Sequence, residues 1–360
     1  ETDLALIQLG RVAAWGDNRY GQLGDGRTAD SAVPRLARVS GVRAIAAGFH
    51  HSLAVTQSGT LWAWGANSEG QLGDGTKSAQ PDPVRVDVPG FVTAVSAGWS
   101  HALALDEDGG VWAWGRNQEG QLGDGTTSER LSPVPVPGLD SVQILAAGKN
   151  STLAGTGDGA VWAWGDNSMA QLGVVAEISR SLPTAVVGSS EQGADDGGFP
   201  ALLAGSEVPL IGQEEISGIA SGANHNLAVA RDGSLWAWGD NSSGQLGDGG
   251  SSVAHSSPVL VPGIDDVTQA AAGLTHSLAL TTDGGVWSWG GNSLGQLGQG
   301  DQRTRTVPEQ VQGLSGVVAI ASDGNHNLAL TEDGTVWAWG DNGYGQLGDG
   351  TTTDRSSPVR

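Results

Sequence analysis

The stretch WGRNQEGQLGDGT at residues 114–126 decides the fold of this chain, because its two halves recur together seven times. The tetrapeptide GQLG, or a near match, returns at spacings of 49, 50, 50, 74, 51 and 50 residues, and W-G-x-N begins six residues before it each time. A period of about fifty residues indicates a repeat architecture in which each unit packs on its neighbours. The seven tetrapeptides begin at Gly21, Gly70, Gly120, Ala170, Gly244, Gly295 and Gly345.

One full unit, residues 92–139, contains four short segments with strand character, separated by Gly, Pro and Asp turns. We name them A (92–97), B (101–105), C (111–115) and D (133–136). Four short antiparallel strands per repeat form a propeller blade. The sequence therefore predicts an all-β fold, a single seven-bladed β-propeller of four-stranded antiparallel blades over residues 1–360.

Side-chain size orders the strands within a blade. Segment A is rich in small residues, as in residues 44–48, which suits the crowded innermost position. Segment D contains proline, which lacks an N–H and is confined to sheet edges, so it belongs on the outside. Segment C holds 13 of the 14 tryptophans, mostly in pairs such as Trp62 and Trp64, and a period of two places both on one face. We expect these pairs to fill the gaps between blades; a stacked array acting as a chromophore or sugar platform is the alternative.

Two units depart from the pattern. Residues 3–6 align with segment B, so the chain holds seven B, C and D segments but six A segments. One blade is therefore expected to lack its innermost strand within this chain, either because the sequence is a piece of a longer protein or because the propeller has an open inner slot. Such an edge could accept a strand donated by a partner. The fourth unit is longer, with an expected insertion at residues 174–215, and has Ser151 where five other units carry histidine.

Composition argues against several kinds of partner. The formal net charge is −22 with 17 Lys and Arg residues, which disfavours nucleic acid, because polyanions are bound by clustered basic side chains. The absence of cysteine excludes thiolate catalysis and Cys-ligated zinc. The sequence contains no apolar run of about 18 residues, so membrane insertion is not predicted. The compartment stays open, with an extracellular or cell-surface location slightly favoured over a cytoplasmic one.

Residues that repeat around the ring are interpreted as scaffold. Histidine begins segment B in five units, and Asp precedes Gly in most turns, which is typical of turn chemistry. Only His50 and His255 lie outside the repeated histidine position. No nucleophile elbow, P-loop or zinc motif is present, so we expect no catalytic residue, no metal site and no cofactor. Calcium on the Asp-Gly turns is the alternative, although the EF-hand pattern is absent.

W-G-x-N followed by G-Q-L-G-D-G-T, together with A-G-x-x-H-S-L-A-L and D-G-x-V-W-A-W-G, resembles the repeat of the regulator of chromosome condensation family. The resemblance covers nearly the whole chain, is to a bacterial-type member of the family, and implies a seven-bladed propeller. It leaves function open, because the family includes a nucleotide exchange factor, a plant UV-B receptor, ubiquitin-ligase modules and a bacterial β-lactamase inhibitor.

Positions that vary while the scaffold stays constant are candidates for recognition. The A-to-B turns and C-to-D loops differ from blade to blade, and strand direction places both at one rim. Aromatic anchors among polar residues are typical of a protein interface, whereas undirected drift of loop residues is the alternative. Trp99, the one tryptophan outside segment C, argues against drift. The predicted partner-binding residues are Phe49, His50, Trp99, Ser100, Lys149, Asn150, Asn224, Leu274, Thr275, Asn325, Tyr20, Glu69, Glu119, Met169, Leu294 and Tyr344.

These features favour a protein–protein interaction scaffold over an enzyme, with another protein as the partner. Inhibition of a secreted enzyme such as a β-lactamase and guanine-nucleotide exchange on a small GTPase are the two alternative functions. A light sensor like the family's plant UV-B receptor is disfavoured, because sensing there depends on a cluster of tryptophans at the A-to-B turns, whereas Trp99 stands alone here. An adhesive role at a cell surface fits the acidity equally well. In the β-lactamase inhibitor resemblance the A-to-B turns bind the target, at positions that match Phe49, His50, Trp99, Ser100, Leu274 and Thr275.

Overall fold

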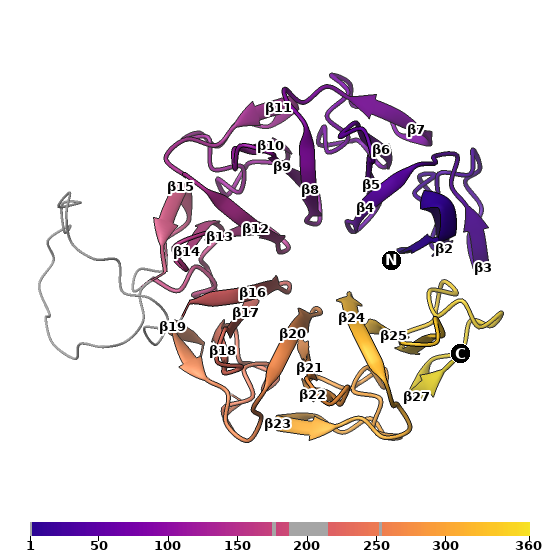
Figure 1. Cartoon of the computed structure of the whole chain (residues 1–360), viewed down its shortest axis with the longest axis vertical. Helices are drawn as coiled ribbons and strands as arrows, with labels where there is room; N and C mark the ends of the chain where they lie inside the picture. Colours follow the sequence, from indigo (N-terminus) through magenta and orange to yellow (C-terminus); the bar gives the residue numbers. More distant parts are fainter. Residues whose placement is uncertain (1, 175–177, 187–214, 252–253) are drawn as a thin grey trace, which may run out of the picture.

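The computed structural model describes residues 2–174, 178–186, 215–251 and 254–360. Seven antiparallel sheets stand around a central channel, as Figure 1 shows, and the predicted all-β propeller is confirmed. Six sheets have four strands, and the sheet of the first blade has three. Within the described ranges the helical content is one short 3-10 turn, η1 (Gln8–Gly10).

The blades are numbered in chain order, and their strands follow the predicted A-to-D sequence from the channel outward. Blade 1 contains β1 (Thr2–Ile7), β2 (Arg11–Gly16) and β3 (Ser31–Leu36). Blade 2 contains β4 (Val42–Ala47), β5 (His51–Thr56), β6 (Leu61–Gly65) and β7 (Gln80–Val86), and blade 3 contains β8 (Val92–Ala97), β9 (His101–Asp106), β10 (Val111–Gly115) and β11 (Arg130–Pro135). Blade 4 contains β12 (Val142–Ala147), β13 (Ser151–Thr156), β14 (Val161–Gly165) and β15 (Arg180–Ala185), and blade 5 contains β16 (Ile216–Ser221), β17 (His225–Ala230), β18 (Leu235–Gly239) and β19 (His255–Leu260). Blade 6 contains β20 (Val267–Ala272), β21 (His276–Thr281), β22 (Val286–Gly290) and β23 (Arg305–Gln310), and blade 7 contains β24 (Val317–Asp323), β25 (His326–Thr331), β26 (Val336–Gly340) and β27 (Arg355–Val359).

Small residues allow the inner strands to converge on the channel. The inner strands β4, β8, β12, β16 and β20 each contact the inner strand of the following blade. Blade 1 begins with a B-type strand, because β1 pairs with β2 along one edge, from Thr2 opposite Gly16 to Ile7 opposite Arg11, and with no described strand along the other. The expectation that one blade lacks its innermost strand is confirmed for the described residues.

The tryptophan directly before the last glycine of each C strand joins one blade to the one before it. Trp114 is fully buried against Leu53, Val55 and Leu72 of blade 2. Its indole N–H donates a hydrogen bond of 2.9 Å to the backbone carbonyl of Gln71, in the G-Q-L-G loop of blade 2. The same bond recurs around the ring at Trp15, Trp64, Trp164, Trp238, Trp289 and Trp339. The bond at Trp15, to Gln346 of blade 7, closes the ring between the two ends of the chain (Figure 1).

The W-G-x-N and G-Q-L-G motifs build one rigid loop. In blade 3 the Asn117 side-chain oxygen accepts the amide of buried Leu122 at 3.0 Å, and its NH₂ donates to the carbonyl of Ser128 at 3.0 Å. Gly115 has a φ of +99°, and a Cβ there would lie 2.5 Å from the carbonyl oxygen of Ser100. The repeated residues that reveal the fold are therefore those that form hydrogen bonds with the backbone of the loop. The residues at the tips of the loops are free to vary.

Blade 4 includes the residues for which an insertion is predicted, 174–215. Residues 180–185 within 174–215 form β15, the outer strand of the blade, and Pro183 gives this strand the proline seen in the other outer strands. Residues 187–214 lie outside the described residues. The bounds 174–215 of the insertion and the single domain over 1–360 stay predictions.

Candidate protein-binding face

The A-to-B turns and C-to-D loops meet on one face of the ring, which we call the variable face. The ring of Tyr20, from a C-to-D loop, lies 5.2 Å from the ring of His50, from an A-to-B turn. Between blades 3 and 4, the side-chain NH₂ of Gln121 donates to Asn150 Oδ1 at 3.5 Å, again joining a C-to-D loop to an A-to-B turn. Neighbouring blades therefore build this face jointly, and residues about thirty positions apart become adjacent on it.

A row of aromatic rings crosses the first three blades on the variable face. Phe49 and Trp99 stack with their ring centroids 4.6 Å apart and their planes 18° from parallel. The Phe49 ring also lies 4.2 Å from the His50 ring, which continues to Tyr20. The Lys149 ammonium lies 4.4 Å from the centroid of Trp99, in a cation–π contact. We call Tyr20, His50, Phe49 and Trp99 the aromatic row.

A buried carboxylate anchors one end of the aromatic row. The Asp17 side chain is fully buried, accepts a hydrogen bond of 2.9 Å from Arg19 Nε, and lies 3.3 Å from His50 Nδ1. Arg19 in turn covers the ring of Tyr344 at 5.0 Å. Burial alone would raise the pKa of Asp17, but the bonds to His50 and Arg19 outweigh it and hold the pKa well below its usual range. The carboxylate is therefore ionised at neutral pH and orients both neighbours.

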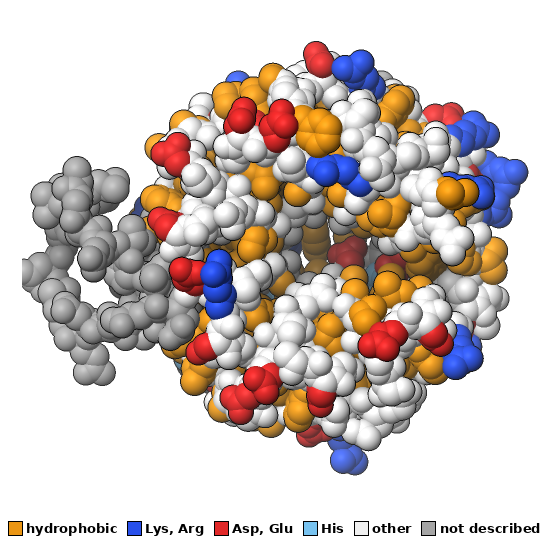
Figure 2. Space-filling model, in the orientation of Figure 1, with side chains coloured by type: hydrophobic (Ala, Val, Ile, Leu, Met, Phe, Trp, Pro, Cys, Tyr) orange, Lys and Arg blue, Asp and Glu red, His pale blue; other side chains and the backbone are white. Residues whose placement is uncertain are grey.

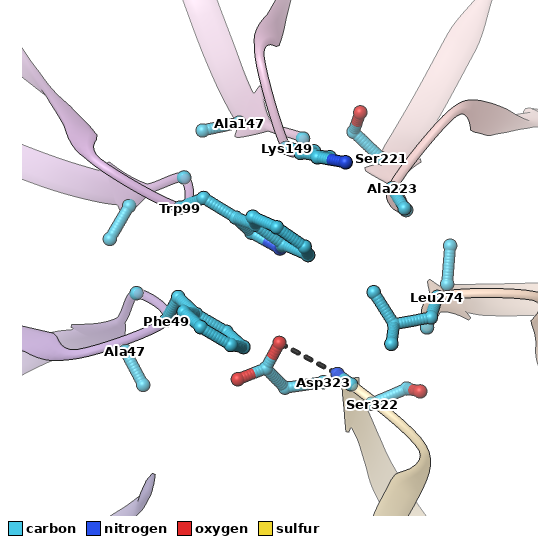
Figure 3. Close-up of a pocket in the computed structure, with 18 residues that line it drawn as sticks. Ala47, Phe49, Trp99, Ala147, Lys149, Ser221, Ala223, Leu274, Ser322 and Asp323 are labelled. Atoms are coloured by element: carbon cyan, nitrogen blue, oxygen red, sulfur yellow. Dashed lines mark hydrogen bonds between the residues drawn. The ribbon is translucent and has the colours of Figure 1, made fainter. Parts of the chain in front are cut away.

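The aromatic row leads into the mouth of the central channel. Figure 3 shows Phe49 and Trp99 side by side, with Leu274 across the opening. Lys149 extends beside Trp99, and the Asp323 carboxylate accepts a hydrogen bond of 2.8 Å from the backbone amide of the next residue. The cavity at the mouth has a volume of about 100 Å³. Aromatic, aliphatic, cationic and anionic side chains thus surround one concave site.

The second residue of each A-to-B turn acts through its backbone. The carbonyl of His50 accepts the amide of Ala66 at 2.8 Å, which ties the turn to the residue after W-G. The equivalent bond is made by the carbonyls of Ser100, Asn150, Asn224, Thr275 and Asn325. This contact explains how the turns are held, and a partner-binding role for these five residues stays a prediction.

The C-to-D residues beyond the row are held by their own loops. Glu119 accepts a hydrogen bond of 2.8 Å from Arg116, and although burial raises the pKa of Glu119, this contact lowers it overall. Within the described chain, Glu69, Met169 and Leu294 make no hydrogen bond, ion pair or ring contact with the aromatic row through their side chains. The structure therefore assembles six of the sixteen predicted residues around the row, namely Tyr20, Phe49, His50, Trp99, Lys149 and Tyr344.

Three residues of this site were absent from the predicted set. Asp17 fills the variable position of W-G-x-N, and Arg19 follows it in the same loop. Asp323 stands where other blades have glycine before the turn, as at Gly48 and Gly98. Comparing the residues at the variable position of W-G-x-N, and at this glycine, among the seven units could have identified Asp17 and Asp323.

The repeated histidines are buried between blades. His101 Nε2 is hydrogen-bonded to Thr152 of blade 4 at 3.1 Å, and His225 Nε2 to Ser277 of blade 6 at 2.9 Å. His51 has no hydrogen-bond partner among the described residues. Burial lowers the pKa of His101 and of His225 to about 4, and that of His51 to about 3. These rings are therefore neutral scaffold residues at pH 7.

This burial predicts a loss of stability in mild acid. The unfolded chain binds protons at these histidines near their usual pKa of 6.5, whereas in the folded chain His101 stays neutral down to about pH 4. The free energy of unfolding should thus fall as the pH drops from about 6.5 towards 4, by up to about 1.4 kcal/mol per pH unit for each such histidine. Urea unfolding at pH 7 and pH 5 measures this change. His101→Asn should reduce the slope; a slope equal to that of the wild type would contradict the assignment.

Other charged groups belong to the scaffold or stand apart. His255 Nε2 lies 3.0 Å from Asp248 on blade 5, in the place of the Arg130 to Asp124 ion pair of blade 3 at 2.6 Å. No group of three or more His, Asp or Glu residues in the described part of the chain is arranged to hold a metal ion. The face shown in Figure 2 has the channel at its centre, and several of its Lys and Arg side chains lie at the upper right edge of the ring. No helix in the described ranges is long and apolar enough to cross a membrane.

Comparison with known proteins places the fold in a family. The model of the RCC1-like domain matches residues 2–196, and that of the regulator of chromosome condensation (RCC1) repeat matches 232–280, 283–330 and 333–360. The zebrafish (Danio rerio) protein RCC2 homolog is 44% identical over 92 residues, which is 24% of this chain and 18% of that protein. The human probable E3 ubiquitin-protein ligase HERC3 is 40% identical over 103 residues, 28% of this chain and 10% of that protein. These matches span less than a fifth of either relative.

Solved structures match over nearly the whole ring. Human WBSCR16 is 27% identical with a TM-score of 0.83, covering 97% of this chain and 93% of that one. Prp20p from Saccharomyces cerevisiae, studied with its binding to Gsp1p and histones, is 25% identical with a TM-score of 0.81, covering 96% and 84%. Seven phased repeats, the family models and these structures agree, and the chain belongs to the family of RCC1-like β-propellers.

Proposed function

We propose that this chain is a non-catalytic protein-binding module whose partner docks on the variable face, over the aromatic row and the channel mouth. The observation that carries the proposal is the stack of Phe49 on Trp99 at 4.6 Å, half-buried at the mouth and covered at one side by Lys149. Large aromatic rings with polar neighbours supply most of the binding energy at protein interfaces. The relatives support protein binding in general terms, since Prp20p was studied with its binding to Gsp1p and histones.

The surroundings of the row favour tight rather than incidental contact. The ion pair of Asp17 with Arg19, and the contact of Asp17 with His50, fix one end, and Lys149 fixes the other. Side chains that are already ordered lose little rotamer entropy when a partner binds. The rigid loops beneath them add to this preorganisation.

The concave mouth suits a partner with a protruding loop or helix end. Phe49, Trp99 and Leu274 line the opening from three blades, so an apolar side chain that enters contacts all three. Lys149 and Asp323 offer charges of both signs beside it, which would orient the polar flanks of such a protrusion.

The test compares capture of proteins from a lysate or secretome by three forms of the chain. Phe49→Ala/Trp99→Ala removes the stack, and we expect the affinity for the captured partner to fall by about 2 kcal/mol or more, roughly thirtyfold. Phe91→Ala is the matched control, because Phe91 precedes β8 on the opposite rim, where its ring contacts Arg43 at 5.1 Å. Isothermal titration with the purified partner then gives each affinity.

The control decides between a specific face and general stickiness. A partner retained by Phe91→Ala and lost by the double variant supports the variable face. Equal capture by all three forms places binding elsewhere and overturns the proposal, as would loss of binding in Phe91→Ala alone.

Two finer forms of this function are distinguished by the partner that is captured. Inhibition of a secreted enzyme such as a β-lactamase is supported by the aromatic rings on the A-to-B turns, and it predicts that turnover stops at one equivalent of wild-type chain but not of Phe49→Ala/Trp99→Ala. Nucleotide exchange is supported by the likeness to Prp20p, and it predicts faster release of labelled GDP from a captured GTPase.

A further inference from the structure

A cavity opens between blades 1 and 2 on the rim opposite the variable face, where the B-to-C turns and D-to-A connectors lie. Its volume of about 470 Å³ falls within the roughly 300–1,000 Å³ usual for small-molecule sites. The connector residues 38–41 form one wall, and residues of the blade 2 turn 56–62 form the other. The backbone amide of Gln57 donates to the carbonyl of Gly41 at 2.7 Å and joins the two walls. We call this cavity the blade 2 crevice; blades 1 and 2 lie side by side at the upper right of Figure 1.

A short connector is the first departure from the repeat at the blade 2 crevice. The connector runs from Ala37 to Val42, whereas the matching segment after blade 3 runs from Val136 to Val142 and is one residue longer. Both segments begin with an amide that donates to the carbonyl of a C-strand valine, at 3.0 and 2.9 Å. The equivalent cavity at blade 7, behind the longer connector 311–317, has a volume of about 260 Å³. The shorter connector therefore coincides with the larger opening.

A turn without a carboxylate is the second departure. Blade 2 has Ser58 where blades 3 to 7 have aspartate. In blade 7 this aspartate, Asp333, accepts the hydroxyl of Thr331 at 2.6 Å. In blade 2 the hydroxyls of Thr56, Ser58 and Thr60 instead form a chain, with oxygen–oxygen distances of 2.9 and 3.2 Å. Because each hydroxyl has two acceptor lone pairs, this chain keeps acceptors that a ligand can use.

Trp62 lines the blade 2 crevice beside the hydroxyl chain. Its ring is half-buried and packs against the cluster that includes Ala37. In blade 3 the indole N–H of the equivalent Trp112 donates to the Asp106 carboxylate at 3.0 Å. Blade 2 has Thr56 at that position, and among the described residues the indole N–H of Trp62 has no hydrogen-bond partner. The crevice thus combines an aromatic surface, an available donor and available acceptors.

The groups that a ligand can reach in the blade 2 crevice are neutral. Arg38 is the one charged residue among the described lining, and its guanidinium donates to the Asp82 carboxylate at 2.8 Å. The other polar side chains of the lining carry hydroxyls, the amide of Gln57 and the indole N–H. A phosphate, carboxylate or ammonium group is bound most strongly by an opposite charge. A sugar instead offers hydroxyls to neutral polar groups and the C–H face of its ring to an aromatic side chain.

We infer that the blade 2 crevice binds a neutral saccharide. One sugar ring stacks its C–H face on Trp62, and its hydroxyls donate to the chain of Thr56, Ser58 and Thr60. The indole N–H and the Gln57 amide donate to neighbouring hydroxyls of the ligand. The site lies on the opposite rim from the variable face, so a sugar can bind here independently of a protein bound there.

The test titrates the whole chain with maltotetraose, cellotetraose, xylotetraose and mannotetraose by isothermal titration calorimetry. At least one should bind with a Kd in the millimolar range or tighter. Trp62→Ala should weaken the binding of that sugar roughly tenfold or more, because it removes the stacking surface. Trp287→Ala is the matched control and should bind the sugar as the wild type does, since Trp287 is the equivalent half-buried ring of blade 6, where the turn carries Asp283.

Thr60→Val tests the hydroxyl chain with a side chain of similar size. It should weaken sugar binding about fivefold by removing one hydrogen-bonding group. Thr335→Val, at the equivalent position of blade 7, should leave the affinity unchanged. Saturation-transfer NMR from aromatic protons of the wild-type chain should label the C–H protons of the bound sugar, and this signal should fall in Trp62→Ala.

The variable face and the charge of the ligand provide the remaining comparisons. Phe49→Ala/Trp99→Ala should bind the sugar with wild-type affinity, which separates the blade 2 crevice from the variable face. Failure of all the neutral sugars to bind the wild type, equal loss in Trp62→Ala and Trp287→Ala, or tighter binding of tetragalacturonate than of any neutral sugar would each overturn the inference.

Discussion

Trp114→Ala should lower the free energy of unfolding by about 3–5 kcal/mol. The side chain is fully buried between blades 2 and 3, and the two sheets cannot close over the space that its removal would leave. The change also removes the N–H that satisfies the Gln71 carbonyl at 2.9 Å. Urea unfolding followed by far-UV circular dichroism measures the loss.

The first tryptophan of the same pair is the matched control. Trp112 lies two residues away on the same face, but it is only partly buried, and its N–H donates to the Asp106 carboxylate at 3.0 Å near the opposite rim. Trp112→Ala should therefore cost less than Trp114→Ala. If the two variants lose equal stability, the joint between blades does not depend on the buried ring. Trp114→Phe, which keeps an aromatic ring but not the N–H, should lie between them.

The repeat made the fold predictable because its fixed residues are the ones that satisfy the backbone. Asn117, Leu122 and the glycines of the loop do the same work in every blade, so their spacing alone indicates the strands between them. The outer strand of blade 4 was harder to recognise, because the loop before it departs from D-G-T and the fourth unit is longer. Pro183 was the remaining local signal there.

The candidate site was predictable as a set of positions but not as an arrangement. Consecutive A-to-B turns must be neighbours in a ring, so Phe49 and Trp99 could be expected on the same face. Their stacking, however, depends on the directions of the two side chains, which no period in the sequence encodes. The repeat pattern also predicted Ser100, whose backbone carbonyl accepts a hydrogen bond from the amide of Arg116 and so holds its own turn.

The joint between blades 7 and 1 shows the same division between repeat and exception. The count of segments indicated that β1 would have a free edge, but the glycine replaced by Asp323 and the partner of His326 were not recognised as related to it. Both departures lie where blade 7 meets blade 1.

Asp3→Ala should lower the free energy of unfolding by about 3 kcal/mol, because it opens the joint between blades 7 and 1. His326 Nε2 lies 2.8 Å from one carboxylate oxygen of Asp3 and 2.9 Å from the other, and both side chains are buried. Without Asp3 the buried imidazole would lose this hydrogen-bond partner. Thermal and urea unfolding would report the change, with an expected decrease in the unfolding midpoint.

Asp3→Asn is the informative companion, because the chain already uses that pair one interface earlier. His276 Nε2 lies 2.8 Å from Asn327 Oδ1 between blades 6 and 7, so an amide at position 3 can accept the same hydrogen bond from His326. We expect Asp3→Asn to retain most of the stability that Asp3→Ala loses. Should both substitutions cost the same, the negative charge of Asp3 rather than its hydrogen bond would hold the ring closed. Should neither cost anything, the closing contact would rest on Trp15 and Gln346 instead, at the outer part of the same joint.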